Sequence, residues 1–165
     1  MALTTRQFAG AVLVASVLVL GAVLLSQFWG GLAPCELCLL QRWPWWIAMA
    51  IAAAAWLIGD RLALNIPAIV LAIVFLVGAA IAFYHVGVEL HWFAGPTACT
   101  AGGGGATSVD ALRAQLLGTK PVMCDAVQWS LFGISLAGWN FLASLAMAGF
   151  CAMTARRCGL WGAAV

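Results

Sequence analysis

The chain has 165 residues, of which 65% are hydrophobic and only 7% are charged, and its mean hydropathy is +1.08. A soluble domain carries roughly 25% charged residues, so the composition excludes an ordinary soluble globular protein and indicates that a lipid bilayer is the main solvent. The net charge of +2, carried by scattered basic residues, argues against nucleic acid as a partner.

Four apolar stretches predict membrane-spanning helices, because about 20 apolar residues are needed to cross the hydrocarbon core. The first stretch is too long for a cleavable signal peptide and lacks a good cleavage site. The second reaches spanning length only if it starts near Cys35 and includes Arg42. We therefore expect an all-α membrane protein, a single domain over residues 1–165, with four transmembrane helices at about 8–29, 35–58, 66–86 and 127–155.

Four spans place both termini on one side of the membrane, and the basic residues indicate which side. Four arginines fall on the side of the termini, whereas three basic and four acidic residues fall on the other side. We therefore expect cytoplasmic termini, with the loops at about 30–34 and 87–126 facing outward. The four arginines are Arg6, Arg61, Arg156 and Arg157.

The second apolar stretch opens with the sequence PCELCLLQRWPWW. With Pro34 at the start of a helix, Cys35, Cys38 and Arg42 fall at i, i+3 and i+7, on one face. The first turn of a helix favours a thiolate, because unpaired N–H groups and the macrodipole lie there. An arginine at the centre of a bilayer costs about 2.5–3.5 kcal/mol on insertion scales. We therefore interpret Arg42 as a functional residue, with a snorkelling side chain as the alternative.

The outer loop at 87–126 contains four consecutive glycines and then the pattern of a short amphipathic helix. Thr107 and Asp110 fit a capping box, and Gly118 is a suitable stop. We expect this short helix to lie in the membrane interface. The alternative is a helix that packs on the rest of the protein.

The expected topology divides the six cysteines into an outer set of four and an inner set of two. Disulfides persist outside the cytoplasm, so the outer four can form two pairs, a Cys-x-x-Cys ring and a second pair across the loop. A structural role for the second pair and a four-thiolate zinc site are the alternatives. The inner two are about 10 Å apart on a helix, too far for a disulfide. The outer set is Cys35, Cys38, Cys99 and Cys124, and the inner set is Cys151 and Cys158.

A membrane quinone suits the residues around the Cys-x-x-Cys pair. A guanidinium can bond a carbonyl oxygen, and the three tryptophans between Trp43 and Trp46 provide an apolar, interfacial environment. No Rossmann glycine fingerprint for a flavin or a nicotinamide is present in the sequence. A lipid-soluble electron acceptor is the interpretation that fits these residues.

The motif PCELCLLQR, the second outer pair Cys99 and Cys124, and four helices with cytoplasmic termini together resemble the bacterial disulfide bond formation protein B (DsbB) family. The likeness extends to SLFGISLAGWN in the fourth helix. It implies an enzyme, a quinone-dependent protein-disulfide oxidoreductase in the bacterial inner membrane with its redox loops facing the periplasm. Such an enzyme reoxidises a periplasmic DsbA-like, thioredoxin-fold oxidase and passes the electrons to ubiquinone or menaquinone.

The resemblance also implies a role for each outer cysteine. Cys99 would form the mixed disulfide with the partner, and Cys124 would then attack Cys35. Cys38 would be the thiolate that meets the quinone, and Arg42 would polarise the quinone oxygen.

Three further residues follow from the same resemblance. His85, at the outer end of the third helix, resembles a family histidine near the quinone, and Glu89 and His91 are weaker candidates. Gln41 stands where some family members have glutamate, so the resemblance does not require a carboxylate there.

Two other functions are compatible with parts of the pattern. A vitamin K epoxide reductase-like quinone reductase also combines four helices with two cysteine pairs, but in that family the loop pair precedes the Cys-x-x-Cys. A non-enzymatic membrane protein with structural disulfides is the second alternative, and it predicts that Cys35 and Cys38 have no redox role.

Overall fold

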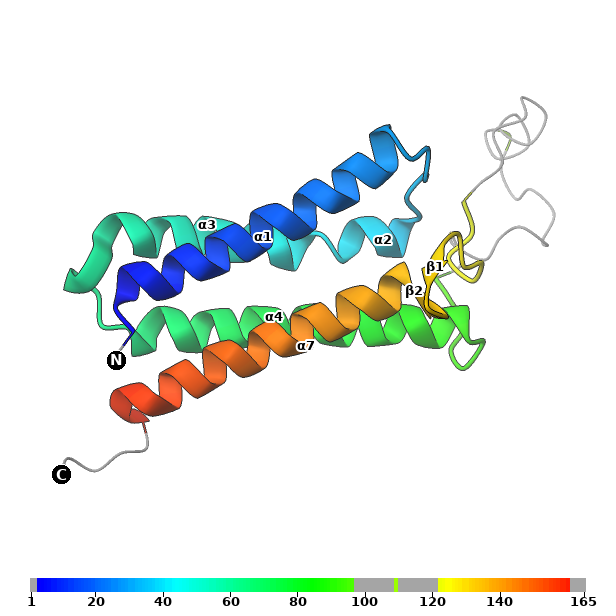
Figure 1. Ribbon diagram of the computed structural model, residues 1–165. Helices are drawn as coiled ribbons and strands as arrows, with labels where there is room; N and C mark the ends of the chain where they lie inside the picture. Colours follow the sequence, from blue (N-terminus) through cyan, green and yellow to red (C-terminus); the bar gives the residue numbers. More distant parts are fainter. Residues whose placement is uncertain (1–2, 97–108, 110–121, 161–165) are drawn as a thin grey trace.

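The computed structural model describes residues 3–96, 109 and 122–160, and within them it is an all-α bundle with one small hairpin (Figure 1). The long helices are α1 (Thr5–Phe28), α3 (Trp43–Ile58), α4 (Asn65–Glu89) and α7 (Leu136–Ala155). The short elements are α2 (Glu36–Leu40), the 3-10 turn η1 (Gly59–Arg61), the strands β1 (Ser130–Leu131) and β2 (Ile134–Ser135), and the π-helical turn η2 (Arg156–Leu160).

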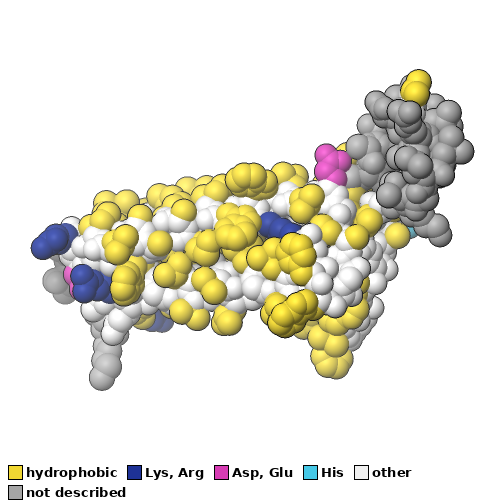
Figure 2. Space-filling model, turned by 90° about the horizontal axis from the view of Figure 1, so that it is seen from above, with side chains coloured by type: hydrophobic (Ala, Val, Ile, Leu, Met, Phe, Trp, Pro, Cys, Tyr) yellow, Lys and Arg dark blue, Asp and Glu magenta, His cyan; other side chains and the backbone are white. Residues whose placement is uncertain are grey.

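Three of the long helices are long and apolar enough to cross a membrane: α1, α4 and the segment Leu136–Cys158 that contains α7. Helix α3 has 16 residues, about 24 Å, and falls short of a bilayer by itself. The prediction of a multi-pass all-α membrane protein is thus confirmed. The surface agrees with it, because Figure 2 shows hydrophobic side chains along the whole bundle and most Lys and Arg side chains at one end.

Small side chains let the helices pack closely, with α1 against α3, α4 against α7, and α3 against α4. The core is rich in alanine and contains a few large rings. Trp45 meets Phe75 edge-on with ring centroids 5.0 Å apart, and Phe8 stacks on Phe150 at 5.5 Å. The beginning of α1 and the end of α7 lie at the same end of the bundle, as an even number of spans requires (Figure 1).

The prediction of one continuous second helix over residues 35–58 is wrong. Helix α2 ends at Leu40, a turn follows at Gln41 and Arg42, and α3 begins at Trp43. The cause is Pro44, which has no N–H to bond the carbonyl of Leu40 and whose ring clashes with that carbonyl in a continuous helix. The N–H of Arg42 bonds instead to the oxygen of Leu39, three residues back, at 3.1 Å.

The prediction that the fourth helix begins near residue 127 is also wrong. Strands β1 and β2 pair over Ser130–Ser135 with a two-residue loop, Phe132 and Gly133, both at positive φ (54° and 77°). Two positive φ values make this a type I′ turn, whose twist matches paired strands. Helix α7 then begins after Ser135, which caps it by accepting a hydrogen bond from the N–H of Gly138 at 3.1 Å.

The third helix extends further than expected, from Asn65 to Glu89, so His85 and Glu89 lie on the same helix one turn apart. Apart from Val109, the expected interfacial helix in the outer loop, including its Thr107 cap and Gly118 stop, lies outside the described residues. Cys99 lies outside them as well.

Candidate functional site

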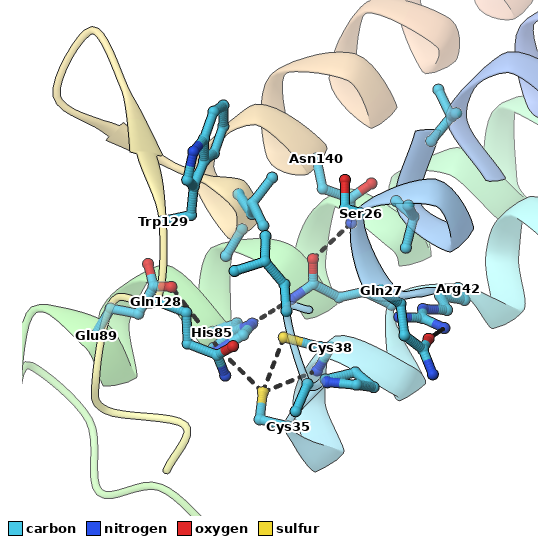
Figure 3. A pocket seen from close by; sticks show the side chains of 18 of the residues that line it. Ser26, Gln27, Cys35, Cys38, Arg42, His85, Glu89, Gln128, Trp129 and Asn140 are labelled. Carbon is cyan, nitrogen blue, oxygen red and sulfur yellow. Dashed lines mark hydrogen bonds and ion pairs between the residues drawn. The ribbon is translucent and has the colours of Figure 1, made fainter. Parts of the chain in front are cut away.

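A mainly apolar pocket, seen from close by in Figure 3, is lined by α2 and by the neighbouring parts of α1, α4 and α7. In Figure 1, α2 lies at the end of the bundle opposite the termini. The wall of the pocket also includes the turn before α3 and the segment after residue 122. The polar side chains in the wall come from α1, from residues 35–42, from the last turns of α4 and from residues 128–140. They include Gln27, Cys35, Cys38, Gln41, Arg42, His85, Glu89, Gln128 and Asn140.

The two thiols of the Cys-x-x-Cys motif lie at the beginning of α2. Cys35 is the N-cap residue, and its sulfur accepts a hydrogen bond from the backbone N–H of Cys38 at 3.2 Å. The two sulfurs are 2.9 Å apart, with the Cys35 thiol donating to Cys38. Cys35 is buried, whereas Cys38 is half-buried and borders the pocket.

The same contact separates the acidities of the two thiols, which lie outside the three spanning segments. The hydrogen bond received from Cys35 lowers the pKa of Cys38 below its usual value. Donation to Cys38, together with burial, raises the pKa of Cys35 to about 12. Cys38 is therefore the thiol of the pair that ionises first, and a thiolate is the reactive form of cysteine.

Cys124 is buried beside this pair. It belongs to a small apolar cluster with Cys35, Leu37 and Val88, against which Cys38 packs. The structure thus brings together three of the four outer cysteines that the sequence singled out, from segments almost 90 residues apart. This proximity is what an exchange of disulfides between the two pairs requires.

Arg42 reaches the pocket from the turn between α2 and α3, and it does not share a helix face with the thiols as the sequence predicted. Its Nη1 donates to Oε1 of Gln27 on α1 at 2.7 Å. Its Nε is buried and has no hydrogen-bond partner among the described residues. A buried donor of this kind is costly unless something accepts from it.

His85 projects from α4 toward the thiols (Figure 3). It is only 2% exposed, and its Nε2 lies 3.6 Å from the sulfur of Cys35 and 4.0 Å from Oε1 of Glu89. Glu89 in turn accepts a hydrogen bond from the hydroxyl of Ser135 at 2.5 Å. His91 is exposed at a positive φ of 60° and does not line this pocket.

Sequence reasoning missed the polar network behind His85. The Nδ1 of His85 contacts Nε2 of Gln41. The Oε1 of Gln41 accepts a hydrogen bond from Nδ2 of Asn140 at 2.6 Å. The Oδ1 of Asn140 in turn accepts one from Nε1 of Trp45 at 2.8 Å. An available signal was the presence of amide side chains in apolar spans, where polar groups are expensive and mark functional sites.

A metal site is a chemical possibility within the same group of residues. Among the described residues, the sulfurs of Cys35 and Cys38 and a ring nitrogen of His85 lie within 4.8 Å of one another. Thiolates and imidazole are typical zinc ligands. This set differs from the four-cysteine zinc site considered from the sequence, because it includes a histidine.

The profile of one protein family matches the chain. The family is described as "Disulfide bond formation protein DsbB", and the match covers residues 5–154. Comparison of the chain with curated proteins and with solved structures gave no match. Because the family match covers most of the chain, it confirms the resemblance inferred from the cysteine motifs. The protein therefore belongs to the DsbB family of four-transmembrane proteins and is a multi-pass membrane thiol–disulfide oxidoreductase that acts in disulfide bond formation.

Proposed function

We propose that this protein reoxidises a periplasmic DsbA-like thioredoxin-fold oxidase and passes the electrons to ubiquinone or menaquinone in a bacterial inner membrane. The observation that carries the proposal is the arrangement of the pocket: the Cys35–Cys38 pair and Arg42, whose Nε has no partner among the described residues, line the same apolar space.

The residues present fit a quinone head group. A quinone is a flat, apolar ring with carbonyl oxygens that only accept hydrogen bonds. The pocket offers a mainly apolar wall, the indole of Trp129, and a cationic donor on Arg42 with one N–H unsatisfied among the described residues. Arg42 would hold one carbonyl oxygen, and Cys38, which lines the same pocket, would be the thiol that meets the ring. When bound, the quinone supplies the two-electron oxidation that closes the Cys35–Cys38 disulfide.

The cysteines would act in a fixed order. A thiolate of the partner attacks Cys99 of the Cys99–Cys124 disulfide, and the second partner thiol then closes the partner's disulfide, leaving Cys99 and Cys124 reduced. The thiolate of Cys124 attacks Cys35 of the Cys35–Cys38 disulfide, and Cys38 leaves as a thiolate. Cys99 then displaces Cys35, which re-forms Cys99–Cys124. The lowered pKa of Cys38 supports its role as the leaving and reactive thiol, and the packing of Cys124 on Cys35 supports this path.

The proposed orientation places this pocket on the periplasmic side. The arginines near the termini, at the other end of the bundle, would lie in the cytoplasm under the positive-inside rule (Figure 2). Cys151 is buried in the core and Cys158 lies near the end of the chain at the opposite end from the pocket, so neither belongs to the proposed exchange path.

The proposal is tested by mixing the purified full-length protein with a reduced thioredoxin-fold oxidase and a soluble quinone, and by following quinone absorbance. We expect turnover that Cys38→Ser abolishes and that Cys158→Ser leaves unchanged. Absence of turnover in the unmodified protein, or full turnover in Cys38→Ser, would show that the protein does not pass electrons from this pair to a quinone.

A further inference from the structure

We propose that Trp45, Asn140 and Gln41 are positioning residues that fix the imidazole of His85 in its Nε2–H tautomer, with the N–H facing the sulfur of Cys35. The four side chains come from α3, α7, the turn before α3, and α4, and they form one continuous hydrogen-bond chain. The inference is the tautomer of the His85 ring. Only the role of its N–H toward the sulfur of Cys35 rests on the proposed function.

The hydrogen-bond chain has a direction, because its first member, the indole of Trp45, can only donate. The indole Nε1 of Trp45 carries a hydrogen and no lone pair for accepting, so the atom of Asn140 that it meets at 2.8 Å must be the amide oxygen. The amide nitrogen of Asn140 then points at Gln41, and the atom it meets at 2.6 Å must be the Gln41 oxygen. Each amide orientation follows from the one before it.

The last link decides the tautomer of His85. With its oxygen turned to Asn140, Gln41 presents its NH₂ group to Nδ1 of His85. An amide nitrogen donates and does not accept, so Nδ1 must accept and carries no hydrogen. In the neutral ring the hydrogen therefore sits on Nε2, which is 3.6 Å from the sulfur of Cys35 and 4.0 Å from Oε1 of Glu89.

Burial makes this direction hard to reverse. Trp45, Gln41 and His85 are 2%, 5% and 2% exposed, and Asn140 is half-buried, so water has limited access to replace a broken link. Turning either amide over would place two donors or two acceptors in contact. A buried polar group left without a partner costs about 1–3 kcal/mol, and such a flip would create at least two of them.

The fixed tautomer has a consequence for the chemistry of the pair. His85 is held as a hydrogen-bond donor to the Cys35 sulfur, where negative charge develops whenever that thiol loses its proton or is displaced from the disulfide. The same tautomer withholds the Nε2 lone pair that a metal would need, although Cys35, Cys38 and His85 are close enough to bind one. The chain of amides thus keeps the dithiol available for exchange.

The tautomer is measurable by ¹⁵N NMR of the purified full-length protein in lipid nanodiscs, in the dithiol form and with labelled histidine. The two ring nitrogens of a neutral histidine have well-separated shifts, according to which one carries the hydrogen. The chain contains two histidines, and His91→Asn assigns the signals, since asparagine tolerates the positive φ at this exposed position. We expect a protonated Nε2 and an unprotonated Nδ1 at His85.

Asn140→Asp tests the hydrogen-bond chain by changing a residue that does not contact His85 directly. A carboxylate at position 140 still accepts from Trp45, but it can only accept from Gln41, so Gln41 turns its oxygen to His85 and requires a hydrogen on Nδ1. We therefore expect the two ring signals of His85 to exchange roles. Asn65→Asp, the same change at the start of α4 and at the far end of the bundle, should leave them in place.

Gln41→Glu provides a second test should the buried aspartate prevent folding. A glutamate at this position accepts from Nδ1–H and frees Nε2, giving the carboxylate–histidine arrangement that supports zinc ligands. We expect the reversed tautomer and roughly 10- to 100-fold tighter zinc binding by the dithiol form. A hydrogen on Nδ1 in the unmodified protein, or unchanged tautomers in both variants, would overturn the inference. None of these measurements uses a quinone or a thiol partner, so they test the tautomer of His85 independently of the proposed function.

Discussion

Arg42 offers the sharpest test of the proposal that the pocket holds a quinone. Replacing Arg42 by alanine removes the bond to Gln27 and also the buried Nε that has no partner among the described residues. The first loss affects the packing of α1 against the turn before α3. The second affects only a ligand that accepts from Nε, so the two consequences can be measured separately.

The expected size of the effect follows from the type of bond. A hydrogen bond from a charged donor contributes about 1.5–3 kcal/mol, and 1.36 kcal/mol corresponds to a factor of ten in affinity. We therefore expect Arg42→Ala to raise the apparent KM for quinone about 10- to 150-fold. The KM for the reduced thioredoxin-fold partner should change less than twofold, because in the proposed mechanism that partner reacts with Cys99 and not at Arg42.

The assay is steady-state quinone reduction with each substrate varied in turn. Arg42→Lys is the matched variant: it keeps the charge but lacks the planar fork, so its KM for quinone should fall between those of the alanine variant and the unmodified protein. Thermal unfolding of both variants reports the loss of the Gln27 contact. Equal increases in both KM values, or no increase for quinone, would refute the assignment of Arg42 as the quinone ligand.

Two further predictions concern the thiols and the helix packing. Alkylation by iodoacetamide requires a thiolate, so in the reduced protein Cys38, with its lowered pKa, should react at a lower pH than Cys35, whose pKa is about 12. Peptide mass spectrometry over a pH series checks this, and equal labelling of both cysteines at every pH would contradict it. Gly78→Val should destabilise the bundle by about 1–3 kcal/mol, because even a Cβ there would lie 3.1 Å from the Cβ of Pro44. Denaturant unfolding measures the loss, and Gly149→Val, where a Cβ meets nothing within 4 Å, should cost far less.

The sequence predicted the existence of the long helices because apolar length is a strong signal in a membrane protein. It predicted their ends poorly, where single residues decide. Pro44 breaks the second helix although hydropathy continues across it, and Phe132 and Gly133 form a tight turn inside an apolar run. The rule for proline was available from the sequence alone. The turn was not, because phenylalanine rarely adopts a positive φ.

The sequence predicted which reactive residues form the candidate site, but it did not predict the hydrogen bonds that connect them. Cys35, Cys38 and Arg42 stood out because thiols and a guanidinium are unusual in an apolar segment. The partnership of Gln41 with Asn140 was invisible, since the two residues are 99 positions apart and nothing in one sequence indicates which polar groups on different helices meet. The family resemblance placed His85 near the quinone, but its contact with Cys35 was not predicted.

The distribution of satisfied and unsatisfied polar groups supports the pocket as a ligand site. A polar group that is buried in a protein without a hydrogen-bond partner costs about 1–3 kcal/mol, so such groups are rare and point to a missing partner. At this end of the bundle Gln27, Gln41, Asn140 and His85 all have partners among the described residues. The Nε of Arg42, another residue of the pocket wall, has no partner in the part of the chain that the structure describes. Partnered amides beside one cationic donor without a partner among the described residues support the proposal of a ligand that brings an acceptor oxygen and little other polarity, as a quinone does.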